Sequence, residues 1–128
     1  MIDIAPGAES SPLAASLAEL VRRNIARDKA ARAEFDRLRG AVAIVADDEG
    51  AALTLRFDFG RLVVHTGVVG VPDLTLRGPI DALARLGELR AGGLVGFVRA
   101  SDLGTLKLYG LRTHPLMVRR LLRVLSEG

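Results

Sequence analysis

The sequence predicts a domain of the α+β class, in which a meander of strands is flanked by helices. In the middle of the chain apolar residues alternate with polar ones, most clearly where Leu53, Leu55 and Phe57 are interleaved with Thr54 and Arg56. This alternation is typical of a half-buried strand. Toward both ends of the chain apolar residues recur every three or four positions, as on one face of an amphipathic helix. Strands grouped together between helices indicate an α+β arrangement.

Length and composition fit a single cytoplasmic domain. The 128 residues suit one core, and because 49% are hydrophobic but only 4% aromatic, aliphatic side chains must fill it. Lysine and arginine number 18 against 15 acids, so the net charge of +3 does not by itself indicate a nucleic-acid or membrane partner. The absence of cysteine excludes disulfides, thiolate metal sites and a cysteine nucleophile.

The first forty residues predict a leader followed by one long helix. Residues 1–11 contain Pro6 and Gly7, and we expect a flexible leader there, with the domain occupying residues 12–128. Pro12 suits the first turn of the helix, and Gly40 ends it. One face of this helix is basic and is either a solvated face or a surface for an anionic membrane or RNA. Its members are Arg22, Arg23, Arg27, Lys29 and Arg32.

Four strands and a short helix are expected next. The strands cover residues 42–46, 52–59, 62–66 and 73–77, and the acidic group 47–49 forms a hairpin loop between the first two. Pro79 opens a helix with Leu83 and Leu86 on its inner side. Residues 87–104 are apolar but rich in glycine, which fits either the mouth of a ligand cavity or a tightly packed helical corner.

The last strand and helix close the domain. Residues 105–109 alternate as a strand does, Gly110 breaks the pattern, and Pro115 opens an amphipathic helix that runs to Leu125. This helix covers either a closed core or a cavity that holds something apolar.

The sequence contains no group of residues with the spacing of a common catalytic or metal-binding motif. The two histidines, His65 and His114, have no serine and acid nearby that would indicate a triad, and we expect structural roles for both. The acidic group 47–49 lacks the spacing of a calcium loop. The few aromatic residues form no platform for nucleic-acid bases. We therefore expect no catalysis, no metal, no cofactor and no nucleic-acid partner.

Three stretches resemble the sterol carrier protein type 2 family. They are residues 51–67 (AALTLRFDFGRLVVHTG), 72–86 (PDLTLRGPIDALARL) and 104–125 (GTLKLYGLRTHPLMVRRLLRVL). In that family a strand of the form Leu, Lys, apolar, any, Gly leads to the terminal helix, and residues 106–110 match this pattern. The resemblance covers residues 14–126. It departs from the family at Ser101, Asp102, Leu103 and Gly104, where family members carry an apolar helical stretch ending in Gly-Lys.

The resemblance implies a fold and a function. The fold is a five-stranded, mostly antiparallel sheet with helices packed on one face, and the function is non-catalytic binding or transfer of a lipid-like ligand in a tunnel between the two layers. The ligand would be a fatty acyl chain, a sterol or a similar lipid. The expected tunnel residues are Leu55, Phe57, Val64, Leu76, Leu83, Leu86, Leu94, Phe97, Val98, Met117, Leu121 and Val124.

An alternative function stays open beside lipid binding. The same fold with a filled core and no ligand would serve as a structural or protein-interaction module, with a homodimer as one form of it. A lipid carrier would also make transient contact with an anionic membrane surface.

Overall fold

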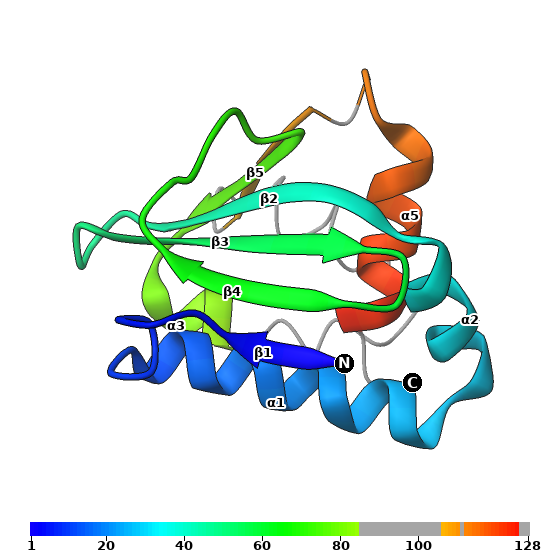
Figure 1. Cartoon of the computed structure of the whole chain (residues 1–128). Coiled ribbons are helices and arrows are strands. Elements are labelled where there is room, and N and C mark those ends of the chain that lie inside the picture. Colours follow the sequence, from blue (N-terminus) through cyan, green and yellow to red (C-terminus); the bar gives the residue numbers. More distant parts are fainter. Residues whose placement is uncertain (85–105, 111, 126–128) are drawn as a thin grey trace.

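The computed structural model describes residues 1–84, 106–110 and 112–125, which form one mixed sheet with helices on one of its faces (Figure 1). The six strands lie in the order β1-β4-β3-β2-β5-β6. They are β1 (Ile2–Ile4), β2 (Arg39–Ala46), β3 (Ala51–Asp58), β4 (Leu62–Thr66), β5 (Leu74–Gly78) and β6 (Lys107–Tyr109). The described helices are α1 (Pro12–Arg27), α2 (Lys29–Arg37), α3 (Ile80–Ala84) and α5 (Pro115–Leu125).

The register of the central strands gives the sheet one apolar face. Val42 on β2 lies between Leu55 on β3 and Leu74 on β5, and the next inward residue of β2, Ile44, is paired in the same way. Because successive side chains of a strand point to opposite faces, the predicted alternation places these aliphatic residues together. The acidic turn before Gly50 joins β2 to β3, as the sequence predicts.

The expected count of five strands is wrong, because the first residues of the predicted leader form a sixth. β1 pairs in parallel with β4, and the Met1 amino group donates a hydrogen bond of 2.9 Å to the Gly60 carbonyl. A strand of three residues is too short for alternation to indicate it. β2 and β5 are also parallel, so the sheet is mixed, with three antiparallel pairs among the five described.

The single long helix expected before β2 is in fact two helices. Asp28 separates α1 from α2 with an extended backbone (φ −125°, ψ 113°), and its side chain accepts a hydrogen bond of 2.9 Å from the Ala30 N–H. A short acidic side chain that caps the next helix competes with continuation of the first one. The chain therefore turns at Asp28.

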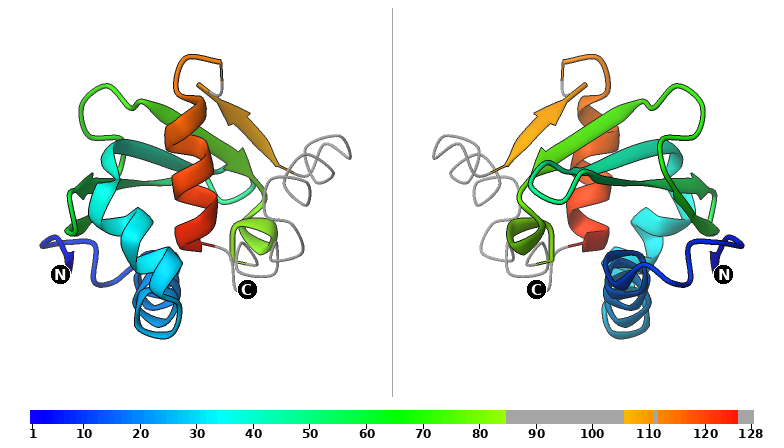
Figure 2. Two further views of the ribbon diagram at one scale, coloured as in Figure 1. Left: turned by 90° about the vertical axis from the view of Figure 1, so that its right-hand side faces the viewer. Right: turned by 90° about the vertical axis from the view of Figure 1, so that its left-hand side faces the viewer.

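The helices bury the apolar face of the sheet. α1, α2 and α5 gather on this face (Figure 2), and the buried core combines their aliphatic residues with those of β2, β3, β4 and β5. Phe35 of α2 meets Phe57 of β3 edge to face, with ring centroids 6.2 Å apart. No helix in the described part of the chain is long and apolar enough to cross a membrane.

Polar contacts fix α5 against the corner between α1 and α2. The buried Asn24 side chain donates a hydrogen bond of 2.8 Å from Nδ2 to the Val124 carbonyl. Arg123 forms an ion pair of 2.9 Å with Asp28, and Arg120 Nε lies 3.2 Å from Glu34 Oε2. The end of α5 is therefore fixed to the first two helices by named contacts as well as by apolar packing.

Replacing Asn24 tests this attachment. Asn24→Ala should lower the free energy of unfolding by about 1–3 kcal/mol, because the buried Val124 carbonyl would lose its donor. Urea denaturation measures the change. Glu19→Ala is the control, since Glu19 is exposed on the same helix and pairs with the exposed Arg22, and it should change stability by less than about 0.5 kcal/mol. An equal loss in both variants would contradict the role given to Asn24.

Candidate functional site

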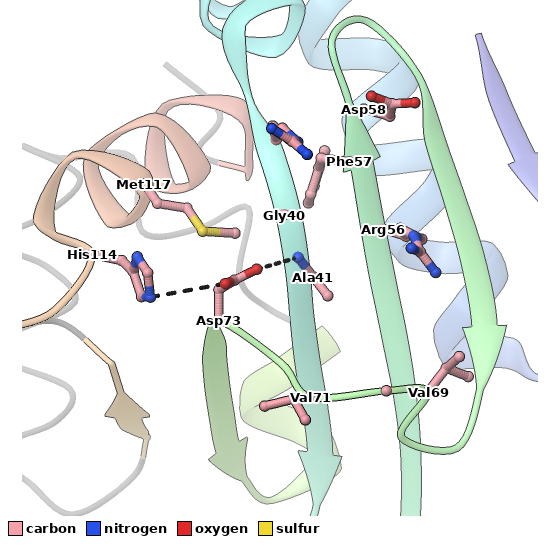
Figure 3. A pocket seen from close by; sticks show the side chains of 12 residues that line it. Gly40, Ala41, Arg56, Phe57, Asp58, Val69, Val71, Asp73, His114 and Met117 are labelled. Atoms are coloured by element: carbon pink, nitrogen blue, oxygen red, sulfur yellow. Dashed lines mark hydrogen bonds and ion pairs between the residues drawn. The ribbon is translucent and has the colours of Figure 1, made fainter.

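An open pocket of about 630 Å³ lies at one end of the sheet, between the start of α5 and the loop 67–72 (Figure 3). The first residues of β2 and the last residues of β3 form its floor. The loop crosses from the end of β4 to the start of β5 and bounds the pocket on the side opposite α5. The pocket therefore lies where three segments distant in the sequence come together.

Asp73 joins these segments. Its Oδ2 atom accepts a hydrogen bond of 2.9 Å from the Ala41 N–H, and its own backbone N–H donates one of 2.9 Å to the Ala41 carbonyl. Its Oδ1 atom lies 3.8 Å from His114 Nε2, just before α5 begins. One carboxylate thus connects the start of β2, the start of β5 and the approach to α5.

Two glycines permit this close approach. Gly40 has φ +131°, and a Cβ atom there would lie 2.7 Å from Asp73 Oδ2 and 2.8 Å from Met117 Cε. Gly110 has φ +102°, and its Cβ would lie 2.5 Å from the Asp73 carbonyl oxygen. Any side chain at either position would collide with its neighbours and strain the backbone. Gly40 therefore leaves space in the pocket lining, and Gly110 lets the chain pass close to the Asp73 backbone.

The inner wall of the pocket is apolar. Phe57 lies directly opposite Gly40 in the β2–β3 register and belongs to the buried core. Met117 approaches Gly40 from α5 and packs against the same core (Figure 3). The wall is therefore continuous with the apolar layer between the sheet and α5.

The outer rim of the pocket is charged. Arg39 and Arg56 lie there with Asp58, and the Arg39 guanidinium is 5.9 Å from the centroid of the Phe59 ring. Among the described lining residues there is no serine, threonine, cysteine or lysine to act as a nucleophile. The described residues also contain no group of three acidic or histidine side chains that could hold a metal ion.

The structure places the expected tunnel residues in three groups. Phe57 and Met117 line the pocket. Four others, Leu86, Leu94, Phe97 and Val98, lie outside the described residues. The remaining ones are buried together in the core beneath the helices: Leu55, Val64, Leu76, Leu83, Leu121 and Val124.

Sequence reasoning missed the polar part of the pocket. It gave Gly40 only the role of ending a helix and assigned His114 to a helix start. Asp73 was expected only as the first residue of a strand. Because Asp73 lies 32 positions from Ala41 and 41 from His114, spacing along the chain gives no signal of their contact.

Replacing Asp73 tests its connecting role. Asp73→Ala should lower the free energy of unfolding by about 1–2 kcal/mol, because the Ala41 N–H would lose its acceptor. Asp73→Asn retains an oxygen acceptor and should keep most of that stability. Urea denaturation gives both values, and amide exchange at Ala41 should accelerate only in the alanine variant. Equal destabilisation by the two substitutions would show that this hydrogen bond is not what Asp73 contributes.

Comparison with known proteins supports the fold. No protein-family model and no curated protein matches the sequence. Among solved structures, one described as "UbiJ-SCP2 Ubiquinone synthesis protein" is similar with a TM-score of 0.71 and 17% identity, over 91% of this chain and 96% of that one. The sterol carrier protein domain 2 of Helicoverpa armigera has a TM-score of 0.59 and 15% identity, covering 86% and 88% of the two chains. Sterol carrier protein 2 from Yarrowia lipolytica gives 0.52 and 17%, covering 94% and 92%. The chain therefore has the fold of the sterol carrier protein 2 domains.

Proposed function

We propose that this chain binds a lipid-like apolar molecule without converting it chemically, in the layer between the sheet and the helices. One observation carries the proposal: Phe57 and Met117 belong to the wall of an open pocket and also contact the core beneath α5. An apolar chain that entered here would meet the aliphatic layer directly. Several similar structures are named as sterol carrier proteins, which supports the same conclusion.

The hydrophobic effect is sufficient for such binding. Each methylene removed from water contributes about 0.8 kcal/mol, so ten of them contribute about 8 kcal/mol before the cost of ordering the ligand. No strong polar anchor is then required. We propose that the tunnel lining comprises the residues expected from the sequence, with Phe57 and Met117 nearest the surface.

A protein-interaction module without a ligand is the second candidate. The described part of the core favours it to some extent, because the expected tunnel residues of β3, β4 and β5 are almost completely buried by protein atoms. A ligand would have to displace or spread these side chains, which costs free energy in a well-packed interior.

Direct detection of a bound lipid separates the two candidates. Native mass spectra of the purified protein should show an added mass that delipidation removes, and a fluorescent fatty acid should bind saturably and be displaced by oleate, cholesterol or a ubiquinone analogue. The ubiquinone analogue is included because one similar structure is named for ubiquinone synthesis. If the protein carries no lipid and shows no saturable probe binding, the lipid-binding proposal fails and the interaction module is the remaining candidate.

Filling the pocket wall should reduce binding. Met117→Trp places a large ring in the pocket wall beside the core, and we expect at least about a fivefold loss of affinity for the fluorescent fatty acid with the fold retained. Arg119→Trp is the control, since Arg119 is exposed on the same helix and does not line the pocket. Unchanged affinity in Met117→Trp would show that the ligand does not enter through this pocket.

A further inference from the structure

We propose that the mouth of this pocket docks on an anionic lipid bilayer. The docking surface is the mouth rim, defined as Val69 and Val71, which line the pocket, together with Val68 and Leu116, the exposed chain neighbours of the lining residues Val69 and Met117. The inference deepens the proposed function and rests on it. If the pocket binds an apolar ligand, docking of its mouth on a membrane lets that ligand pass between bilayer and protein without crossing water.

The exposed apolar side chains concentrate at this mouth. In the described part of the chain seven large hydrophobic residues are exposed, and the mouth rim supplies four of them. Val71 is 92% exposed, Leu116 54% and Val68 52%. The loop rises from the end of β4 to the start of β5 and reaches the upper part of the molecule, where α5 also begins (Figures 1 and 2). Single exposed hydrophobics are ordinary, but several gathered at a pocket mouth indicate an interaction surface.

The loop backbone is held in place while its valines face water. Thr54 is 1% exposed, and its Oγ1 atom accepts a hydrogen bond of 3.0 Å from the Val69 N–H. The same hydroxyl donates one of 2.7 Å to the Gly67 carbonyl. Thr54 lies on the sheet face opposite Leu53 and Leu55, so the loop crosses the face that the helices leave open (Figure 3). Thr54 therefore holds the loop backbone against the sheet while the valine side chains stay exposed.

The charges around the mouth complement an anionic surface. Arg39 and Arg56 line the pocket, and Arg112 is exposed two residues before His114. None of these three arginines forms an ion pair within the described part of the chain. Two acids also line the pocket: Asp73 is already engaged by Ala41 and His114, and Asp58 lies at the rim beside Arg39 and Arg56. Arginine beside short aliphatic side chains suits a surface where acyl chains meet phosphate groups.

The basic face of α1 and α2 is less suited to the same role. Arg22 pairs with Glu19 at 2.7 Å, and Arg32 pairs with Asp36 at 3.2 Å. α1 also lies at the end of the molecule away from the loop and the start of α5 (Figure 1). A membrane bound there would leave the pocket mouth turned away from it.

Vesicle sedimentation of the whole chain tests the proposal. We expect the protein to bind phosphatidylcholine vesicles containing about 30% phosphatidylglycerol, more weakly at high salt, and hardly to bind pure phosphatidylcholine. Val68→Asp and Val71→Asp should each lower this affinity about tenfold, because both remove apolar contact and add like charge. Ala33→Asp is the matched control, since Ala33 is exposed beside Arg32 on the basic helical face, and it should change affinity less than about twofold.

The outcomes separate docking from ligand binding. Val68 does not line the pocket, so Val68→Asp should still bind the fluorescent fatty acid in solution as the unmodified chain does. If no chain binds that probe yet the vesicle results hold, docking stands and the proposed function fails. Failure of the unmodified chain to bind anionic vesicles would overturn the docking proposal. A loss in Ala33→Asp equal to or greater than that in Val68→Asp would also overturn it.

Discussion

The apolar face of the sheet must be covered, and the rest of the structure depends on how that is achieved. Val42, Ile44 and their neighbours on β3 and β5 would be exposed to water without α1, α2 and α5. The chain turns at Asp28, so that α2 leaves the end of α1 at an angle, and Asn24 fixes the end of α5 to α1 (Figure 1). This attachment fixes the last turn of α5, and the cover over the sheet stops at the opposite end of the helix, at Pro115.

The candidate site lies where the cover stops. At the start of β2, Gly40 presents no side chain, so Met117 reaches it from α5 and lines the pocket together with the buried Phe57. Asp73 holds the surrounding segments together, and Thr54 fixes the loop on the opposite side. The same end of the molecule thus combines an apolar wall, a charged rim and exposed valines. This combination suits the proposed entry of an apolar ligand from a membrane surface.

Much of the fold could be predicted because it depends on local patterns. Alternation located β2 to β5, helical spacing located α5, and the acidic turn before Gly50 appeared where expected. β1 could not be predicted because it owes its structure to pairing with β4, and the break at Asp28 was hidden by apolar spacing that continues on both sides. The pocket depends on Asp73 meeting residues far away along the chain, and only the tertiary structure shows that.

The two methionines allow one direct test of ligand binding at this site. With ¹³C-labelled methionine methyl groups, Met117 reports from the pocket wall and Met1 reports from the exposed N-terminus. Titration with a long-chain fatty acid below its micelle concentration should shift the Met117 methyl signal saturably and leave Met1 almost unchanged. If the Met117 signal stays in place at saturating fatty acid, or both signals move together, an apolar ligand does not bind in this pocket.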